Sequence, residues 1–321
     1  MPRNIAAIFS PRGFSSCFLR ATYGTCIRDT RKCYGKRGLK MLMNNEEYHA
    51  HPAVSKSSLD LISRSPLHYW SRYLDPKRIA TEPTAAMLLG TAVHTHILEL
   101  DAWDSRYVTA PAAIDRRTKA GKEAWAAFAE EAGGRSIISR DDHELVYEMG
   151  LAISRHRAAT WLLHGMPGKP ETTHMWFDKE TGLECKCRPD WLSDDGKTIV
   201  DLKTTEDASP KEFQRSIAKW GYHRQASWYL DGVEQATGIR PEQFIFVCVE
   251  KKPPYAVAVY VADPLMIEAG AKATAGALRK LAECKASDKW PSYSDEVELI
   301  SLPPWMLPKA DGCALPPIEM Y

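Results

Sequence analysis

Hydrophobic positions recur with a helical period in the first half of the chain. A helix is expected to begin after Ser55, whose hydroxyl can cap it, with Leu59 and Ile62 on one face. Pro66 is expected to restart or kink this helix. Further helical stretches are expected over 84–100, 123–131 and 144–156. The pattern therefore predicts a helical N-terminal part.

From residue 171 onward the pattern changes to short strands separated by turn residues. Residues 171–177 and 183–192, joined by a turn at 178–182, predict a β-hairpin, and 198–204 predict a third strand. The rest of the pattern predicts a helix over 213–235 and two late strands, 244–249 and 255–261. The order of these elements along the chain is helices, a three-strand meander, a helix and two strands. This order predicts an α/β domain with a central mixed sheet flanked by helices.

The two ends of the chain differ in composition from the middle. Residues 1–40 carry nine Lys or Arg and a single acid. This composition predicts a basic extension that does not fold, or a reading frame whose start was assigned too far upstream. A targeting segment is the alternative for this stretch. Residues 41–321 are expected to form one domain, with an irregular proline-rich tail from about residue 288.

Charge and cysteine content exclude several classes of protein. The whole chain has 42 basic and 41 acidic residues. Because nine of the basic residues lie in 1–40, residues 41–321 carry a net negative charge, which does not suit a protein that binds polyanions over its whole surface. No apolar run approaches the roughly 20 residues that span a bilayer, so no membrane partner is expected. Cys185 and Cys187 are expected to point the same way from one strand as reduced thiols, which is typical of a cytoplasmic protein.

One predicted hairpin carries two aspartates and a lysine. Asp195-Gly196 is a strong two-residue turn signal, and counting outward from it places Asp190 opposite Asp201. Directly opposed residues have Cβ atoms about 4.5–5.5 Å apart, so the two carboxylates repel each other unless a cation lies between them. Lys203 projects from the same face as Asp201.

This arrangement is typical of a metal site with an amine beside it. Hard oxygen ligands with room for waters favour Mg²⁺, with Mn²⁺ as a second choice. The metal would activate water and polarise a phosphoryl group, while Lys203 positions or deprotonates that water. The alternative interpretation is a surface hairpin in which Lys203 forms an incidental salt bridge with Asp190 or Asp201.

Two helices add residues that fit the same chemistry. His94 follows Gly90 by four residues on a predicted helix, although a histidine satisfied in the core or on the surface is the alternative. Gln225 and Tyr229 are i,i+4 neighbours on the later helix, with Arg224 beside them. Their amide and phenol groups suit a phosphate or a sugar, and ordinary helix surface is the alternative.

Taken together, these motifs resemble a known family. Gly-x-x-x-His, Pro-Asp, Asp-x-Lys and Gln-x-x-x-Tyr occur in this order and resemble the PD-(D/E)xK nucleases of the RecB-like exonuclease branch. The likeness is greatest to the RecE, or exonuclease VIII, group of phages and prophages, and it covers about residues 44–308. It implies a restriction-endonuclease-like core, and it leaves the first forty residues unmatched.

The resemblance also implies roles for individual residues. His94, Asp190 and Asp201 would be metal ligands, together with the backbone carbonyl of Leu202. Lys203 would be the catalytic lysine, acting with Asp190 and Asp201. Gln225, Tyr229, Tyr222 and Arg224 would lie on the substrate side. Glu171, at the start of the preceding strand, is a weaker candidate.

The implied activity is Mg²⁺-dependent hydrolysis of linear double-stranded DNA from its ends, from 5′ to 3′. The 3′ single strand would then pass to an annealing protein of the RecT type. Processive digestion implies a homo-oligomeric ring whose channel could be lined by basic residues: Arg116, Arg117, Lys119 and Lys122. Alternatives are an endonuclease or single-strand nuclease of the same fold, a non-catalytic DNA-binding recombination accessory protein, and a small-molecule phosphoesterase.

Overall fold

The computed structural model describes residues 43–78, 84–112, 114–303 and 306. All of them belong to one unit, residues 37–321, which is the unit described here. The predictions made for residues 1–40, a basic extension or a targeting segment, lie outside the described residues.

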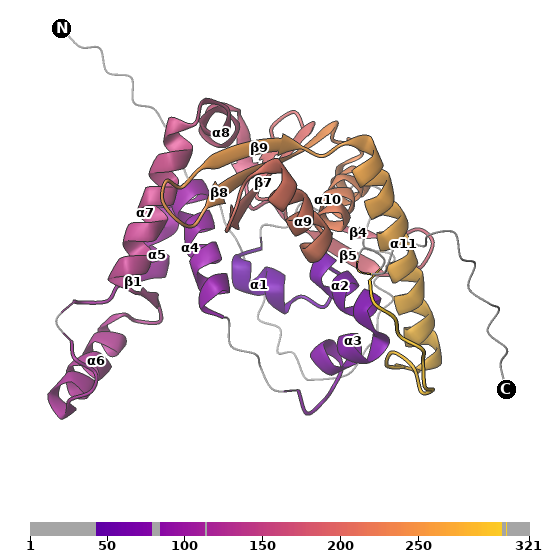
Figure 1. The fold of residues 1–321 in the computed structure, drawn as a ribbon, viewed down its shortest axis with the longest axis horizontal. Helices are drawn as coiled ribbons and strands as arrows, with labels where there is room; N and C mark the ends of the chain where they lie inside the picture. The colour runs from indigo at the N-terminus through magenta and orange to yellow at the C-terminus, as the bar shows by residue number, and fades with distance from the viewer. Residues whose placement is uncertain (1–42, 79–83, 113, 304–305, 307–321) are drawn as a thin grey trace, which may run out of the picture. The chain divides into compact units, whose positions relative to one another are not determined.

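Helices dominate the first half of this unit, as the periodicity predicts (Figure 1). The helices are α1 (Asn45–Ala50), α2 (Lys56–Arg64), α3 (Pro66–Tyr73), α4 (Ala85–Leu98), the 3₁₀ turn η2 (Leu100–Ala102), α5 (Trp103–Arg106), α6 (Lys119–Glu131), α7 (Arg140–Arg155), α8 (Arg157–Thr160), the π-helical turn η3 (Trp161–Gly165), α9 (Pro210–Trp220), α10 (Tyr222–Thr237) and α11 (Pro264–Ser287). Local chemistry sets many of the boundaries. Thr84 caps α4 through a hydrogen bond from the Met87 N–H, and Pro66 occupies the first position of α3.

The central sheet has five strands in the order β3-β6-β7-β8-β9, and β7 pairs in parallel only with β8. Its strands are β3 (Gly168–Pro170), β6 (Trp191–Ser193), β7 (Thr198–Thr205), β8 (Gln243–Glu250) and β9 (Val257–Val261). Two small sheets accompany it, β1 (Tyr107–Thr109) with β2 (Ser136–Ile138) and β4 (His174–Phe177) with β5 (Glu184–Cys187). The predicted central mixed sheet flanked by helices is confirmed.

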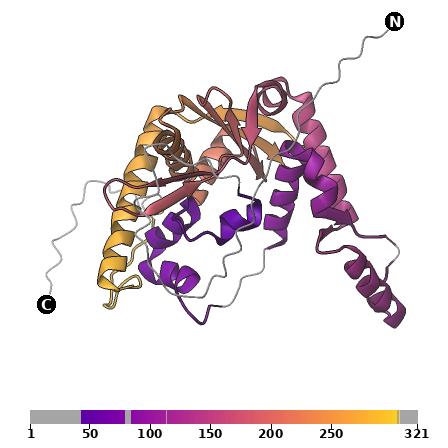
Figure 2. The same cartoon turned by 180° about the vertical axis from the view of Figure 1, so that it is seen from behind.

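Each face of the central sheet packs against its own layer of helices (Figures 1 and 2). On β8, Phe244, Phe246 and Cys248 belong to a core shared with α2, α9, α10 and α11. The alternate residues Ile245, Val247 and Val249 join a second core, built with α4, α7 and α8. Period-two alternation on a strand buried on both sides therefore produces a layered α/β arrangement.

Two expectations about individual elements are wrong in detail, and one helix was missed. The strand expected over 183–192 is interrupted: β5 ends at Cys187 and β6 begins at Trp191 in a different sheet, around Pro189, which has no N–H to donate. The helix expected over 213–235 is two helices, because Gly221 between them adopts φ 65°. The long helix α11, which precedes the predicted tail, was not expected.

Two further sequence expectations concern membranes and thiols. Within the part of the chain that the structure describes, no helix is both long and apolar enough to cross a bilayer. Cys185 and Cys187 lie two residues apart on β5, and both are buried as free thiols in the same hydrophobic core.

Candidate metal centre and catalytic lysine

The β6–β7 hairpin places its two aspartates as predicted. Trp191 pairs with Val200 and Leu192 with Ile199, and continuing this register puts Asp190 opposite Asp201. The Leu202 N–H donates a hydrogen bond of 2.7 Å to Oδ2 of Asp190. The carboxylate that precedes β6 is therefore anchored directly to the backbone of β7.

Asp201 is completely buried, and side chains occupy both of its oxygens. Gln225 on α10 donates from Nε2 to Oδ1 of Asp201 at 2.5 Å. No hydrogen bond of ordinary geometry reaches Oδ2, which contacts the ammonium group of Lys203. Lys203 in turn lies over the ring of Tyr222, with Nζ 5.0 Å from the ring centroid. The lysine of the Asp-x-Lys motif is thus held between a carboxylate and an aromatic face.

Three side chains from separate elements offer ligand atoms around a single point. His94 projects from α4, Glu171 directly follows β3, and Asp190 precedes β6, with one ligand atom of each within 4.8 Å of the other two. Nδ1 of His94 is 3.5 Å from Oδ2 of Asp190. The sequence rated Glu171 below Asp201 as a ligand, whereas the structure groups Glu171 with His94 and Asp190.

The backbone at Glu171 is held in an unusual conformation. Its φ of 49° lies in the left-handed region, which a glutamate adopts only where surrounding contacts stabilise it. The Glu171 N–H donates to the carbonyl of Asp190 at 3.1 Å, and Nε of Arg188 donates to the carbonyl of Glu171 at 2.9 Å. The same Nε lies 3.5 Å from the Glu171 carboxylate. These contacts turn the side chain toward Asp190, and the sequence carried no signal for this φ.

Burial disturbs the ionisation of all three carboxyl groups, and the charge of Asp190 adds to the shift of the other two. Burial, helped by the charge of Asp190, raises the pKa of Glu171 to about 8, although Arg188 opposes the shift. Burial also raises the pKa of Asp190 to about 6 against the ammonium of Lys203, and that of Asp201 to about 6. Acids with raised pKa values, gathered at one place, form a site that a cation would stabilise.

The two basic groups at the site shift in opposite directions. Burial, together with the nearby charge of Lys203, lowers the pKa of His94 to about 4, so its imidazole is neutral at pH 7. Burial alone would lower the pKa of Lys203, but the carboxylates of Asp201 and Asp190 outweigh it and raise that pKa well above its ordinary value. A neutral imidazole is the form that binds metals, while the lysine remains an ammonium ion.

The residues predicted to lie on the substrate side make several different contacts. Gln225 and Tyr222 contact Asp201 and Lys203, as described above. Tyr229 packs edge-on against Phe244, with ring centroids 6.3 Å apart. Arg224 forms an ion pair of 3.0 Å with Asp60 on α2. Their contact with a substrate remains a prediction, as does ligation by Asp201 and by the carbonyl of Leu202.

The residues present fit a hard divalent cation. Glu171, Asp190 and Asp201 provide oxygen donors, and the half-buried Lys203 supplies one positive charge among these three acids. The imidazole of His94 adds a nitrogen donor, which Mn²⁺ accepts more readily than Mg²⁺. The chemistry of this donor set therefore suits either ion.

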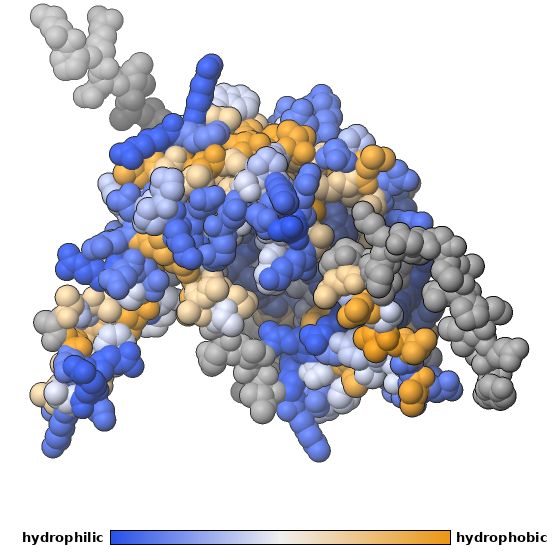
Figure 3. Space-filling model, viewed as in Figure 1, coloured by the Kyte–Doolittle hydropathy of each residue, from blue (hydrophilic) through white to orange (hydrophobic). Residues whose placement is uncertain are grey.

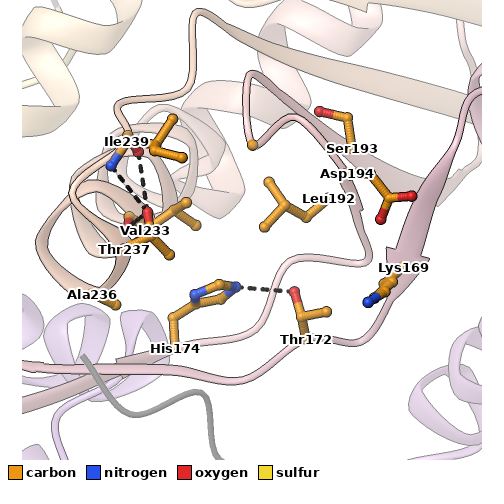
Figure 4. Close-up of a pocket in the computed structure, with 11 residues that line it drawn as sticks. Lys169, Thr172, His174, Leu192, Ser193, Asp194, Val233, Ala236, Thr237 and Ile239 are labelled. Atoms are coloured by element: carbon orange, nitrogen blue, oxygen red, sulfur yellow. Dashed lines mark hydrogen bonds between the residues drawn. The ribbon is translucent and has the colours of Figure 1, made fainter. Parts of the chain in front are cut away.

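A separate cavity of about 200 Å³ lies beside the β3–β6 edge of the sheet (Figure 4). Leu192 and Ile239 contribute apolar walls, and His174 accepts or donates a 3.0 Å hydrogen bond with Thr172. None of the proposed metal ligands lines this cavity, although Thr172 directly follows Glu171. The cavity is therefore distinct from the carboxylate cluster.

Comparisons with known proteins identify the family and support the fold. Residues 55–303 match the sequence family described as a PDDEXK-like domain of unknown function (DUF3799). No curated protein matches the chain. A Eubacterium rectale protein described as a candidate exonuclease is similar in structure, with a TM-score of 0.56 and 16% identity over 82% of this chain and 96% of that one.

Two further solved structures match with lower TM-scores. A phage-related exonuclease from Haemophilus somnus has a TM-score of 0.31 and 14% identity, and it covers 62% of this chain and 95% of its own. An alkaline exonuclease from Laribacter hongkongensis has a TM-score of 0.25 and 18% identity, over 62% and 97%. Such scores are too low to support an argument about this chain.

The family match extends over most of the chain and includes every residue of the metal centre described above. The fold agrees with it, since a five-stranded mixed sheet flanked by helices carries the Pro-Asp and Asp-x-Lys motifs on one hairpin. Family and fold together support a nuclease with a divalent-metal site. The chain belongs to the PDDEXK-like family.

Proposed function

We propose that this protein is a Mg²⁺-dependent exonuclease that digests linear double-stranded DNA from 5′ to 3′ and leaves 3′ single strands. The observation that carries the proposal is the convergence of His94, Glu171 and Asp190 beside the Asp201–Lys203 pair. The exonuclease-like fold supports the proposal, and the polarity and the duplex substrate come from the resemblance to the RecE group.

In this proposal the groups that bind the cation are held in place before the substrate binds. His94, Glu171 and Asp190 would bind the cation, with Asp201 and the carbonyl of Leu202 as further ligands. When bound, the cation supplies Lewis-acid activation of water and of the phosphoryl group. Mn²⁺ would substitute for Mg²⁺ because of the imidazole donor.

Lys203 would act as a cation rather than as a base. Its raised pKa keeps it protonated at neutral pH, so it can donate hydrogen bonds to the attacking water or to the phosphate as negative charge develops. Asp201 fixes the ammonium, and Gln225 fixes Asp201. Tyr222, which lies under the ammonium, would complete the positioning of this group.

The wider setting that we propose is recombination by strand annealing in the cytoplasm. The 3′ strands would pass to an annealing protein of the RecT type, and a homo-oligomeric ring would keep the enzyme on DNA. Exposed basic residues support contact with phosphates, because they concentrate just before and within the first turn of α6: Arg116, Arg117, Lys119 and Lys122.

The decisive experiment compares DNA substrates in the presence of Mg²⁺ or Mn²⁺. The full chain is incubated with linear duplex labelled at the 5′ or the 3′ end, beside a closed circle. Early release of the 5′ label as mononucleotide, with the circle intact, is the expected result. A cut circle would instead assign an endonuclease, and intact DNA in every lane would favour a DNA-binding accessory protein.

Lys203→Ala and Lys197→Ala form a matched pair for this assay. Both lysines lie on the β6–β7 hairpin, but Lys197 is exposed and pairs with Glu242 on the surface. Lys203→Ala is expected to abolish hydrolysis while leaving metal-dependent DNA binding intact, because the lost group acts mainly in the transition state. Lys197→Ala is expected to retain full activity. Equal loss of folding and activity in Lys203→Ala would make that lysine structural.

A further inference from the structure

The two edges of the central sheet are protected to very different degrees. The edge strand β3 is three residues long and contains Lys169 and Pro170, both of which discourage pairing with another strand. The opposite edge strand, β9, runs from Val257 to Val261 and contains neither a charge nor a proline. An unprotected edge of this kind is a site for strand addition.

The register shows which backbone groups of β9 are free. The Ala262 N–H donates to the carbonyl of Phe244 at 2.9 Å, and the Glu250 N–H donates to that of Ala256 at 3.0 Å. Even-numbered residues of β9 therefore face β8. The N–H and C=O groups of Val257, Val259 and Val261 point outward, and they bond to no backbone group among the described residues.

The surface around this edge is apolar. Figure 3 shows a band of hydrophobic residues along the top of the molecule, where Figure 1 places β9. The side chain of Val261 is 61% exposed. Lys251 and Lys252 lie at the preceding turn and both contact Glu206, and the side chain of Lys252 is 78% exposed.

A second unpartnered apolar segment lies after α11. Residues 297–302 form neither helix nor strand, and three of their side chains are almost fully exposed: Val297 at 103%, Leu299 at 89% and Ile300 at 91%. Apolar and acidic residues mix here, since Glu298 separates Val297 from Leu299. A short run rich in apolar side chains with strand propensity is suited to joining a sheet.

This segment cannot reach the β9 edge of its own chain. The helix α11 begins three residues after β9 and has 24 residues, so its far end lies about 36 Å from its start. The chain is then fixed to the early helices, where the carbonyl of Pro291 accepts from the Leu67 N–H and Tyr293 accepts from Nε of Arg64. From Tyr293 to Val297 the chain spans at most about 14 Å. Figures 1 and 2 both place β9 and this segment at opposite ends of α11.

We infer that residues 297–302 of one copy pair as an added strand with β9 of a second copy. The free N–H and C=O groups of β9 would gain partners, and the exposed Val297, Leu299 and Ile300 would be covered. The acid Glu298 would pair with the exposed ammonium group of Lys252. Because the two surfaces differ, the contact is head-to-tail and produces a closed ring or an open chain.

This interface would assemble the ring of the proposed function, but it rests on the edge and the segment rather than on nuclease activity. Its test is sedimentation velocity of the full chain without metal or DNA. Wild type is expected to be oligomeric, whereas Leu299→Glu/Ile300→Glu is expected to weaken association at least about tenfold. The matched control is Leu100→Glu, which changes an exposed leucine of η2, an element that belongs to neither surface, and is expected to remain oligomeric.

Mixing two defective chains tests the head-to-tail arrangement. Val259→Pro removes an outward N–H without breaking a bond to β8, and Val261→Lys is a second edge variant in case the first lowers stability. An edge variant mixed with Leu299→Glu/Ile300→Glu is expected to form 1:1 heterodimers, because one working contact remains. If the edge variants and the Leu299→Glu/Ile300→Glu variant all remain oligomeric, this interface is wrong, although a ring could still form through other contacts. If wild type is monomeric, both the interface and the ring are wrong. A monomer that still digests DNA would leave the nuclease proposal intact.

Discussion

Two neighbouring regions of the molecule bury several charged side chains, and they do so in opposite ways. On β5 and just after it, Lys186 and Arg188 are cations whose donors reach main-chain carbonyls. Lys186 donates to the carbonyl of His51 at 2.7 Å and to that of Tyr48, whose ring lies 4.5 Å from its Nζ. Arg188 donates to the carbonyls of Glu171 and Met43. At the candidate metal centre, by contrast, three acids, Glu171, Asp190 and Asp201, share the single ammonium group of Lys203.

The difference teaches how a buried charge can be interpreted. A cation whose donors reach main-chain carbonyls ties segments together, and here Lys186 and Arg188 fix residues 43–51 against the sheet. Burial raises the pKa values of Glu171 and Asp190, and the charge of Asp190 raises that of Glu171 further, so a bound cation would stabilise these carboxylates. The first arrangement stabilises the fold, whereas the second stabilises a bound cation.

The largest expected effect comes from removing a charge at the acidic region. Asp190→Asn keeps an oxygen that can accept from the Leu202 N–H but removes the charge of a proposed metal ligand. We expect hydrolysis to fall at least about a thousandfold, or roughly 4 kcal/mol of transition-state stabilisation. The metal-free protein should be at least as stable as wild type, because one repelling charge is gone. The nuclease assay checks the first statement, and thermal melting without metal checks the second. If the variant is strongly destabilised, Asp190 stabilises the fold itself, and the contrast between the two regions is wrong.

The corresponding change at the cationic region should affect stability instead. Lys186→Met leaves the carbonyls of Tyr48 and His51 buried without a donor, and we expect a loss of about 2–4 kcal/mol in the free energy of unfolding. Denaturant titration measures this loss, with the exposed Lys179→Met as control. Activity per folded molecule should be unchanged, so a selective loss of activity would place Lys186 in the catalytic machinery.

The pH dependence of metal binding provides a smaller and more specific effect. The pKa of Glu171 rises from an ordinary 4.5 to about 8 on folding, so the folded, metal-free chain binds more protons in this range than the unfolded chain. Its stability should therefore fall as pH rises from 4.5 to 8, and a cation that replaces the proton should restore it. We expect saturating Mg²⁺ to raise the melting temperature by several degrees more at about pH 8.5 than at about pH 6. Glu171→Gln should remove most of that difference; if it does not, Glu171 is not a ligand.

Arg188 connects the two regions, and it should show the smallest effect. Arg188→Lys keeps the charge beside Glu171 but loses the fork that also reaches Met43. We expect roughly tenfold weaker Mn²⁺ binding by calorimetry, as is typical for groups that orient a ligand. Arg188→Gln should weaken binding further, and equal affinity in all three proteins would show that Glu171 is positioned without Arg188.

Sequence patterns could predict the parts of the site that depend on local signals. Asp195-Gly196 fixes a two-residue turn, Gly196 indeed has φ 72°, and the opposed pair Asp190–Asp201 follows by counting. Alternation predicted β7 and β8 almost to the residue. These features depend on neighbours in the sequence, which is why the pattern contained them.

The remaining features depend on contacts between distant segments. Glu171 joins the site only because Arg188 and Asp190 hold its backbone at φ 49°, and no pattern of residue types encodes that. The break between β5 and β6 sends consecutive strands into separate sheets, while the pattern showed one continuous strand. Gly221 could have been identified as a helix end, since glycine is the residue that most readily adopts a left-handed conformation there.

The central position of β7 has a consequence for how the site opens. β7 is hydrogen-bonded along its whole length to β8 and at Ile199 and Val200 also to β6, so its paired amides should exchange with solvent only when much of the domain unfolds. Asp201 and Lys203 belong to this most persistent strand, whereas His94 and Glu171 come from a helix and from the end of the short edge strand β3. Cation exchange and product release would then depend on movements of the outer elements, around a lysine and an aspartate that stay in place.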